Sequence, residues 1–300
     1  MSWSGSCFSN PHQQFLSTFS RVKWPAQAEN MRTTSIFVAL AGLAAVGGCA
    51  VSTQQEVQMG QQEAQQISTQ LPMLQDAQIN SYVNDLGNRI AKRTSRADLD
   101  WHFAVVNTDV VNAFALPGGY VYVNRGILER ATSMDELAGV IGHEIEHVVL
   151  RHSVQQMQQQ QGANVGLSIA CALTTVCNNQ VAATAINIGG TAVFARFSRQ
   201  DEVQADDGGF QNVIRAGISP QGMLSFFQKL LAEEQAQGGS GAAAPWFTDH
   251  PGTQDRIADI QRMLSQMSPS TLRGLTTDEA SFQSMKRRLS QLPKAPAGAQ

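Results

Sequence analysis

The sequence predicts a mainly α-helical domain with one small β-sheet, which is an α+β fold class. Three observations lead to this prediction. Apolar residues recur every three or four positions over long stretches, only short segments alternate between apolar and polar residues, and Ser, Gly and Pro mark the ends of the helical stretches. We expect a single domain over residues 54–292 and a disordered tail over 293–300.

The first part of the domain is predicted to hold two helices and the strands of the sheet. Residues 54–93 have helical spacing, interrupted at Pro72, which cannot continue a helix. Trp101–Asn107 (WHFAVVN) and Gly119–Val123 (GYVYV) alternate as strands do, and Asn112–Ala115 between them is expected to be extended as well.

The rest of the domain is predicted to be helical. Ser133 and Glu136 have the spacing of a capping box, so a helix is expected to begin there and to run to about Gln160. A helical hairpin is predicted over residues 162–197. Further helices are expected over Ser198–Arg215, from Ser219-Pro220 to about Gln235 and over Thr253–Met267, with a flexible loop at 237–245 (QGGSGAAAP).

Composition limits the classes of partner. The chain is 42% hydrophobic and 15% charged, with a net charge of −3 and a pI of about 6.1. It has no basic stripe and no acidic tail, so nucleic acid is not an expected partner.

The N-terminal region has the features of a secretory signal. From Met31 one arginine precedes the apolar run Ser35–Val46, which is too short for a comfortable membrane span but suits the apolar core of a signal peptide. The following VGGC resembles a bacterial lipobox and predicts lipidation of Cys49, with an ordinary cleaved signal or an uncleaved anchor as alternatives.

These features divide the N-terminal region as follows. We expect a signal peptide over 31–48, an anchor and linker over 49–53, and a non-translated or disordered extension over 1–30. In a secreted chain Cys171 and Cys177 can be oxidised, so a disulfide between them and two buried free thiols are both possible states.

A metal-binding motif lies in the helix predicted after Ser133. The segment GVIGHEIEHVVLRHS contains His143, Glu144 and His147 in the pattern HExxH. At about 100° per residue the two histidines lie about 40° apart on one helix face, so both can reach one zinc ion. Glu144 is turned about 100° from His143, beside the metal, where a general base acting on water would stand. A helix with two surface histidines is the alternative.

The third ligand is expected from a separate helix. His152 lies five positions after His147, about 140° around a continuous helix, and is therefore predicted to be a helix-face residue. Glu202 and Asp206 are four positions apart and share a helix face. Glu202 would complete a site of two histidines and a glutamate, and Asp206 would accept the second N–H of a ligand histidine. Two solvated acids on an ordinary helix are the alternative.

With these residues identified, the chain resembles the CAAX-prenyl-protease-like zinc metallopeptidases, and among them the periplasmic lipoproteins of bacteria. The resemblance implies a gluzincin-type domain with an HExxH active-site helix and one Zn²⁺ per subunit. In one small departure, Gln204 stands where the family often has a glutamate, in the pattern E-x-E-A-D. The matching segments, in the family's order over roughly residues 54–267, are VNAFALPGGYVYVNRGIL, DELAGVIGHEIEHVVLRH, FSRQDEVQADDGG, AGISPQGM and DHPGTQDRIADI.

The resemblance assigns roles to two residues near the C-terminus. His250, in Asp249-His250-Pro251, matches a histidine that can occupy the fourth zinc position and plug the site. Arg256 matches an arginine that stabilises the developing oxyanion. From the residues alone, His250 could equally be an ordinary loop histidine. The alternative for Arg256 is a cation on a helix surface.

The resemblance also implies a function, a zinc-dependent endopeptidase that cleaves unfolded or misfolded envelope proteins in quality control, on the periplasmic face of the outer membrane. Asn112, Ala113 and Phe114 would bind an extended peptide through edge-strand hydrogen bonds, which recognise the peptide backbone and not its side chains. The expected partners are these substrates, the membrane through the Cys49 anchor and, as a candidate, outer-membrane assembly machinery. The alternative is an autoinhibited chaperone or assembly factor whose zinc site is plugged by His250.

Overall fold

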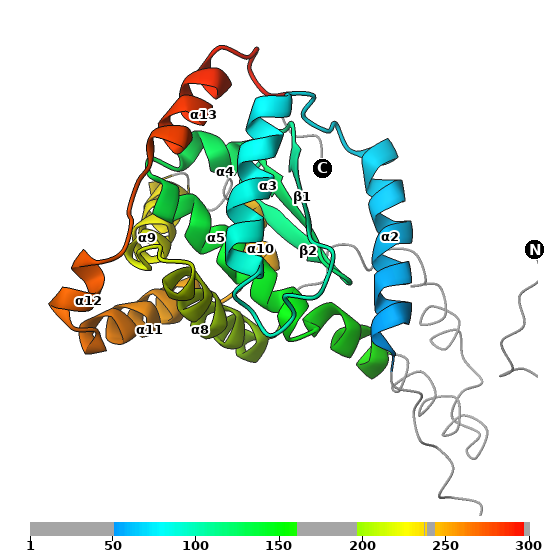
Figure 1. The fold of residues 1–300 in the computed structure, drawn as a ribbon, viewed down its shortest axis with the longest axis horizontal. Helices are drawn as coiled ribbons and strands as arrows, with labels where there is room; N and C mark the ends of the chain where they lie inside the picture. The colour runs from blue at the N-terminus through cyan, green and yellow to red at the C-terminus, as the bar shows by residue number, and fades with distance from the viewer. Residues whose placement is uncertain (1–50, 161–196, 237, 239–243, 297–300) are drawn as a thin grey trace, which may run out of the picture. The chain divides into compact units, whose positions relative to one another are not determined.

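The computed structural model describes residues 51–160, 197–236, 238 and 244–296 (Figure 1). None of the helices in these residues combines the length and the apolar character that a membrane crossing requires. The predicted extension and signal peptide, Cys49, Cys171 and Cys177 lie outside the described residues, as does the hairpin predicted over 162–197 except for Phe197.

The described residues are mainly helical with one small sheet, as the sequence predicts. The two helices expected on either side of Pro72 are α2 and α3, and the HExxH motif lies in α5. The helices are α2 (Thr53–Gln70), α3 (Ala77–Ala91), α4 (Arg125–Arg130), α5 (Met134–Val149), α8 (Arg199–Arg215), α9 (Gln221–Ala236), α10 (Ala244–Asp249), α11 (Thr253–Gln266), α12 (Pro269–Arg273) and α13 (Ala280–Ser290).

The sheet contains the three segments predicted to be extended. Its strands are β1 (His102–Val106), β2 (Ala113–Leu116) and β3 (Tyr120–Asn124), in the order β1-β3-β2. β1 runs parallel to β3, and β2 runs antiparallel to it. β2 is therefore an edge strand, and one side of its backbone is not paired with another strand in the described chain.

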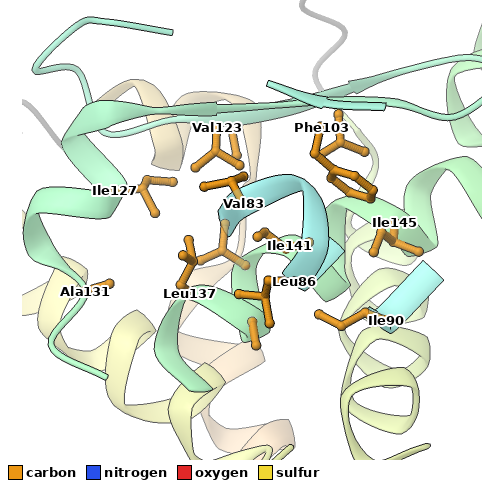
Figure 2. Close-up of a cluster of buried hydrophobic side chains, with 14 of the residues drawn as sticks. Val83, Leu86, Ile90, Phe103, Val123, Ile127, Ala131, Leu137, Ile141 and Ile145 are labelled. Carbon is orange, nitrogen blue, oxygen red and sulfur yellow. The ribbon is translucent and has the colours of Figure 1, made fainter. Parts of the chain in front are cut away.

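Both faces of the sheet are covered by helices. Figure 2 shows Phe103 and Val123 on the face that packs against the buried side chains of α3 and α5. The opposite face contributes Phe114 and Tyr122, which belong to a smaller apolar cluster with Ile67 of α2. Successive residues of a strand point to opposite faces, which explains why neighbouring strand residues belong to different clusters.

α5 lies at the centre of the fold, and every residue from Met134 to Val148 is buried. It packs against α3, α8, α9 and β2. The approach of α8 is close because glycines face each other: a Cβ on Gly209 would lie 2.9 Å from the backbone nitrogen of His143. This close contact brings the acidic residues of α8 beside the histidines of α5.

The capping box predicted at the start of α5 is wrong. Ser133 is the N-cap residue, but its side chain makes no cap hydrogen bond and donates to Asp135 instead. Glu136 Oε2 accepts from the backbone nitrogen of Thr132 at 2.7 Å and from Nζ of Lys229 at 2.6 Å. The Glu136 carboxylate, predicted to cap the helix, therefore binds a lysine of α9 instead.

The uninterrupted helix predicted to about Gln160 is also wrong. α5 ends at Val149, and Arg151 has a φ of 60°, in the left-handed region. Helical residues resume at His152 and continue to Gln160. At this turn, Nε of Arg151 lies 2.8 Å from Oε2 of the fully buried Glu56.

Several short helices were not predicted. α10 occupies part of the segment expected to be a flexible loop, and its Trp246 is fully buried. α13 buries Phe282, Met285 and Leu289 against the core. Beyond α13, the carbonyl of Pro293 accepts a 2.7 Å hydrogen bond from Nη1 of Arg125.

Candidate metal centre

Four buried side chains from three parts of the chain meet beside α5. His143 and His147 come from α5 itself, Glu202 from α8, and His250 from the residue that follows α10. One ligand atom from each lies within 4.8 Å of the others. The structure thus brings together the three predicted ligands and the predicted plug.

The ligand atoms have similar separations. Nε2 of His143 lies 3.0 Å from Nε2 of His147 and 3.2 Å from Nδ1 of His250. Oε1 of Glu202 lies 3.5 Å from Nε2 of His147 and 3.2 Å from Nδ1 of His250. Three nitrogens and a carboxylate therefore converge on one point.

Glu144 lies beside this group of atoms. Its side chain is fully buried, and neither carboxylate oxygen has a hydrogen-bond partner among the described residues. Oε1 lies 3.5 Å from Nε2 of His250. Burial raises the pKa of the Glu144 carboxyl. Such a group is equipped to accept a proton from a water molecule.

A second layer of charge lies behind the ligands. Oδ1 of Asp206 is 2.9 Å from Nδ1 of His143, which is the contact predicted for Asp206. Arg256 donates through Nε and Nη2 to both Asp206 oxygens, at 2.6 and 2.7 Å. Its Nη1 lies 2.6 Å from Oε2 of Glu202. Burial alone would raise the pKa of Glu202, but His250 and Arg256 hold it well below its usual range.

These contacts make Arg256 a positioning residue in this conformation. It is 2% exposed, which excludes the alternative of a surface cation. Its guanidinium faces the carboxylates of Asp206 and Glu202 and, at 3.4 Å, the carbonyl oxygen of His250. The oxyanion role implied by the resemblance stays a prediction.

His152 is not the helix-face residue that a continuous helix predicted. It is 2% exposed, and its Nδ1 lies 2.9 Å from Nδ1 of His147. Its Nε2 lies 3.1 Å from Oε1 of Gln204. The physical reason is the positive φ of Arg151, which turns the chain back toward the site after α5 ends. Burial and the neighbouring His143 hold the pKa of His147 well below its ordinary value, as a neutral ligand requires.

Comparison with known proteins gives this geometry a family. Residues 77–264 match Peptidase family M48, which covers more than half of the chain. The chain belongs to this family. Family M48 uses zinc, so the resemblance to zinc metallopeptidases is confirmed.

Two of the similar proteins come from Escherichia coli (strain K12). The chain is 33% identical to the beta-barrel assembly-enhancing protease over 228 residues, or 74% of this chain and 46% of that relative. It is 30% identical to the metalloprotease LoiP over 187 residues, or 62% of this chain and 69% of that relative. The chain therefore spans about half the length of the beta-barrel assembly-enhancing proteases it matches.

The four side chains fit the metal of family M48. Tetrahedral zinc lies about 2.0–2.1 Å from its ligand atoms, which sets those atoms about 3.3–3.4 Å apart. The separations of 3.0–3.5 Å in this site agree with that value. With the proton of His143 held on Nδ1 by Asp206, Nε2 keeps a lone pair for a metal.

His250 is the fourth side chain of this group, and a catalytic zinc site leaves its fourth position to water or substrate, so the plug role of His250 stays a prediction. Its Nδ1 faces the ligand atoms and its ring stacks on Trp246, with centroids 4.4 Å apart. Asn112, just before β2, donates from Nδ2 to Oδ2 of Asp249 at 2.8 Å. This hydrogen bond ties the predicted substrate strand to the residue next to His250.

Three residues around the site were missed from the sequence. Trp246 packs on His250, His152 contacts His147, and Phe197 stacks on His147 with centroids 3.9 Å apart. Trp246 lies in no motif, and Phe197 begins the matching segment FSRQDEVQADDGG but was given no role. The third histidine of the HExxH segment was visible, but the sequence does not reveal the turn that brings it back.

Proposed function

We propose that the chain is a zinc-dependent endopeptidase of the bacterial envelope that cleaves unfolded or misfolded proteins. The observation that carries the proposal is the position of Glu144, a buried carboxylate without a hydrogen-bond partner in the described residues, beside four convergent ligands. A purely structural zinc site would have no use for a free buried base.

The proposed reaction uses residues of this chain in separate roles. His143, His147 and Glu202 would hold the metal, which when bound supplies Lewis acidity toward a peptide carbonyl. Glu144 takes a proton from the water that attacks the carbonyl carbon and returns it to the amine as the C–N bond breaks. Asp206 and Arg256 keep His143 and Glu202 in place through the hydrogen bonds and ion pair described above.

The substrate is proposed to bind along β2 as an extended segment. Ala113 and Phe114 lie in this edge strand, and Asn112 precedes it. Strand addition uses main-chain hydrogen bonds, so it suits unfolded chains of varied sequence. One relative is named for enhancing β-barrel assembly, which supports outer-membrane proteins as substrates and their assembly machinery as a candidate partner.

The second candidate function is an autoinhibited chaperone or assembly factor. The observation that favours it is His250, 2% exposed and 3.2 Å from both His143 Nε2 and Glu202 Oε1 through its Nδ1. With the fourth position taken, the protein would bind unfolded chains along β2 and seldom cut them.

The peptidase proposal is tested with casein. We expect residues 50–300 to degrade casein, to lose this activity in a zinc chelator and to regain it when zinc is returned, because the ligand set fits zinc. Fragment formation is followed by electrophoresis. Cleavage that continues in excess chelator would rule out a metallopeptidase.

We further propose that Cys49 is lipidated and anchors the protein at the periplasmic face of the outer membrane. Acyl chains add about 0.8 kcal/mol of membrane affinity per buried CH₂, so two or three chains hold a protein stably. In a bacterial host, Cys49→Ser is expected to remove the protein from the outer-membrane fraction. Cys171→Ser is the matched control. A Cys49→Ser protein that stays in the outer-membrane fraction would refute the anchor.

A further inference from the structure

The two histidines of the HExxH motif differ in what lies behind them. Nδ1 of His143 contacts a carboxylate oxygen of Asp206, and this carboxylate is paired with Arg256. Nδ1 of His147 instead contacts a second imidazole, that of His152, which leads to the amide of Gln204. One ligand therefore has a charged support and the other a neutral one.

We propose that His152 and Gln204 are positioning residues that fix the proton of His147 on Nδ1 and thereby set the zinc affinity of the site. This inference rests on the ligand role of His147 in the proposed function.

The direction of the hydrogen bonds from His147 through His152 to Gln204 follows from counting protons. A neutral imidazole carries one N–H, so the nitrogen that faces a metal must be the other one. Nε2 of His147 faces the ligand cluster, 3.0 Å from Nε2 of His143. Its proton must then be on Nδ1, which donates to Nδ1 of His152 at 2.9 Å. The proton of His152 is left on Nε2, which donates to Oε1 of Gln204 at 3.1 Å.

Neighbouring residues fix the orientation of the His147 and His152 rings. The φ of 60° at Arg151 returns His152 to the site, and its ring lies at 74° to that of His147 with centroids 5.0 Å apart. Phe197 stacks on His147 at an interplanar angle of 23°. Asp201 Oδ1, at 3.8 Å, lies too far from Nε2 of His152 to replace Gln204 as its acceptor.

Because this series of hydrogen bonds ends at the amide of Gln204, the direction of donation can reverse. A glutamine can offer its oxygen or, after turning, its NH₂ group. The turned amide would donate to His152, His152 would donate to His147, and the proton of His147 would move to Nε2, where it opposes metal binding. A carboxylate can only accept, so a glutamate at position 204 would permit the metal-binding direction alone. Gln204 is exposed, so a charge there has little desolvation cost.

The test is the zinc affinity of the full chain, purified in detergent and measured by competition with a chromophoric chelator. Loss of an outer partner of a metal-bound histidine weakens metal binding by about 10–100-fold. We expect His152→Leu to show such a loss. His152→Asn should restore part of the affinity, since Asn Oδ1 can take the place of Nδ1 of His152 and accept from His147. His102→Leu, on β1, is the matched control and should leave the affinity unchanged.

Position 204 provides a second test that does not depend on the folding of His152→Leu. Gln204→Leu should weaken zinc binding and Gln204→Glu should strengthen it, each relative to the native chain. Opposite effects at one exposed position would not arise from a general loss of stability. Zinc affinity within twofold of the native value in His152→Leu, an Asn variant as weak as the Leu variant, or weaker binding in Gln204→Glu would each overturn the inference.

One further variant separates this inference from the proposed function. If His147→Ala leaves zinc affinity unchanged, the ligand set is wrong and the proposed function fails with it. If His147→Ala abolishes zinc binding while the variants at 152 and 204 match the native chain, only the positioning role fails.

Discussion

Replacing Glu144 by Gln is expected to lower peptidase activity by a factor of about 10²–10⁴ and to leave zinc bound. The amide has the shape of the carboxyl but cannot accept the proton of the attacking water. Neither oxygen of Glu144 has a hydrogen-bond partner in the described residues, so the substitution breaks no hydrogen bond of the fold. The measurement is the rate of casein degradation together with the zinc content of the purified protein.

A neighbouring acid provides the matched control for this prediction. Glu146 is on the same helix and 8% exposed, and its Oε2 accepts a 2.6 Å hydrogen bond from Nδ2 of Asn212. Glu146→Gln should retain activity, because it does not contact the ligand group and its amide oxygen can still accept. Native activity in Glu144→Gln would refute the assignment of Glu144 as the base.

Replacing His250 by Ala is expected to raise the rate of casein degradation at least about tenfold, which corresponds to about 1.4 kcal/mol in the barrier. Nδ1 of His250 competes with water and substrate for the fourth position, and only the fraction of molecules with that position free can react. The three remaining side chains, His143, His147 and Glu202, still provide the ligand number of a catalytic zinc site.

Two comparisons sharpen this prediction. The double variant His250→Ala with Glu144→Gln should be inactive, which shows that the gained activity arises at this site. Unchanged or lower activity in His250→Ala would mean that His250 does not block the site. An active single variant beside a nearly inactive native chain would instead support the autoinhibited form as the resting state.

Much of the fold could be predicted from local sequence. Pro72 separates α2 from α3, and the alternation in WHFAVVN and GYVYV identifies β1 and β3. Both signals are local, because a proline and an apolar–polar alternation each affect the backbone within a few residues. The HExxH spacing places His143 and His147 on one helix face for the same reason. Glu202 and Asp206 could be proposed because a four-residue spacing also has a fixed meaning on a helix.

The start and end of α5 could not be predicted, because distant residues decide them. Glu136 accepts a hydrogen bond from Lys229 of α9 instead of forming the cap, and Arg151, at the turn after α5, pairs with Glu56 near the start of the domain. The short helix α10 likewise depends on the burial of Trp246 in a core that other segments build. Each is a contact between residues far apart in the sequence.

By itself, the sequence determined the ligand types, their spacing within each helix and the family to which the chain belongs. Only the tertiary structure decided how the helices meet: α8 approaches α5 at Gly209, which brings Asp206 to His143, and α11 packs against α8, which brings Arg256 to both acids. Only the turn after α5 decided that His152 supports His147. Periodicity acts along one helix, whereas the support of a metal ligand depends on side chains that packing brings from elsewhere.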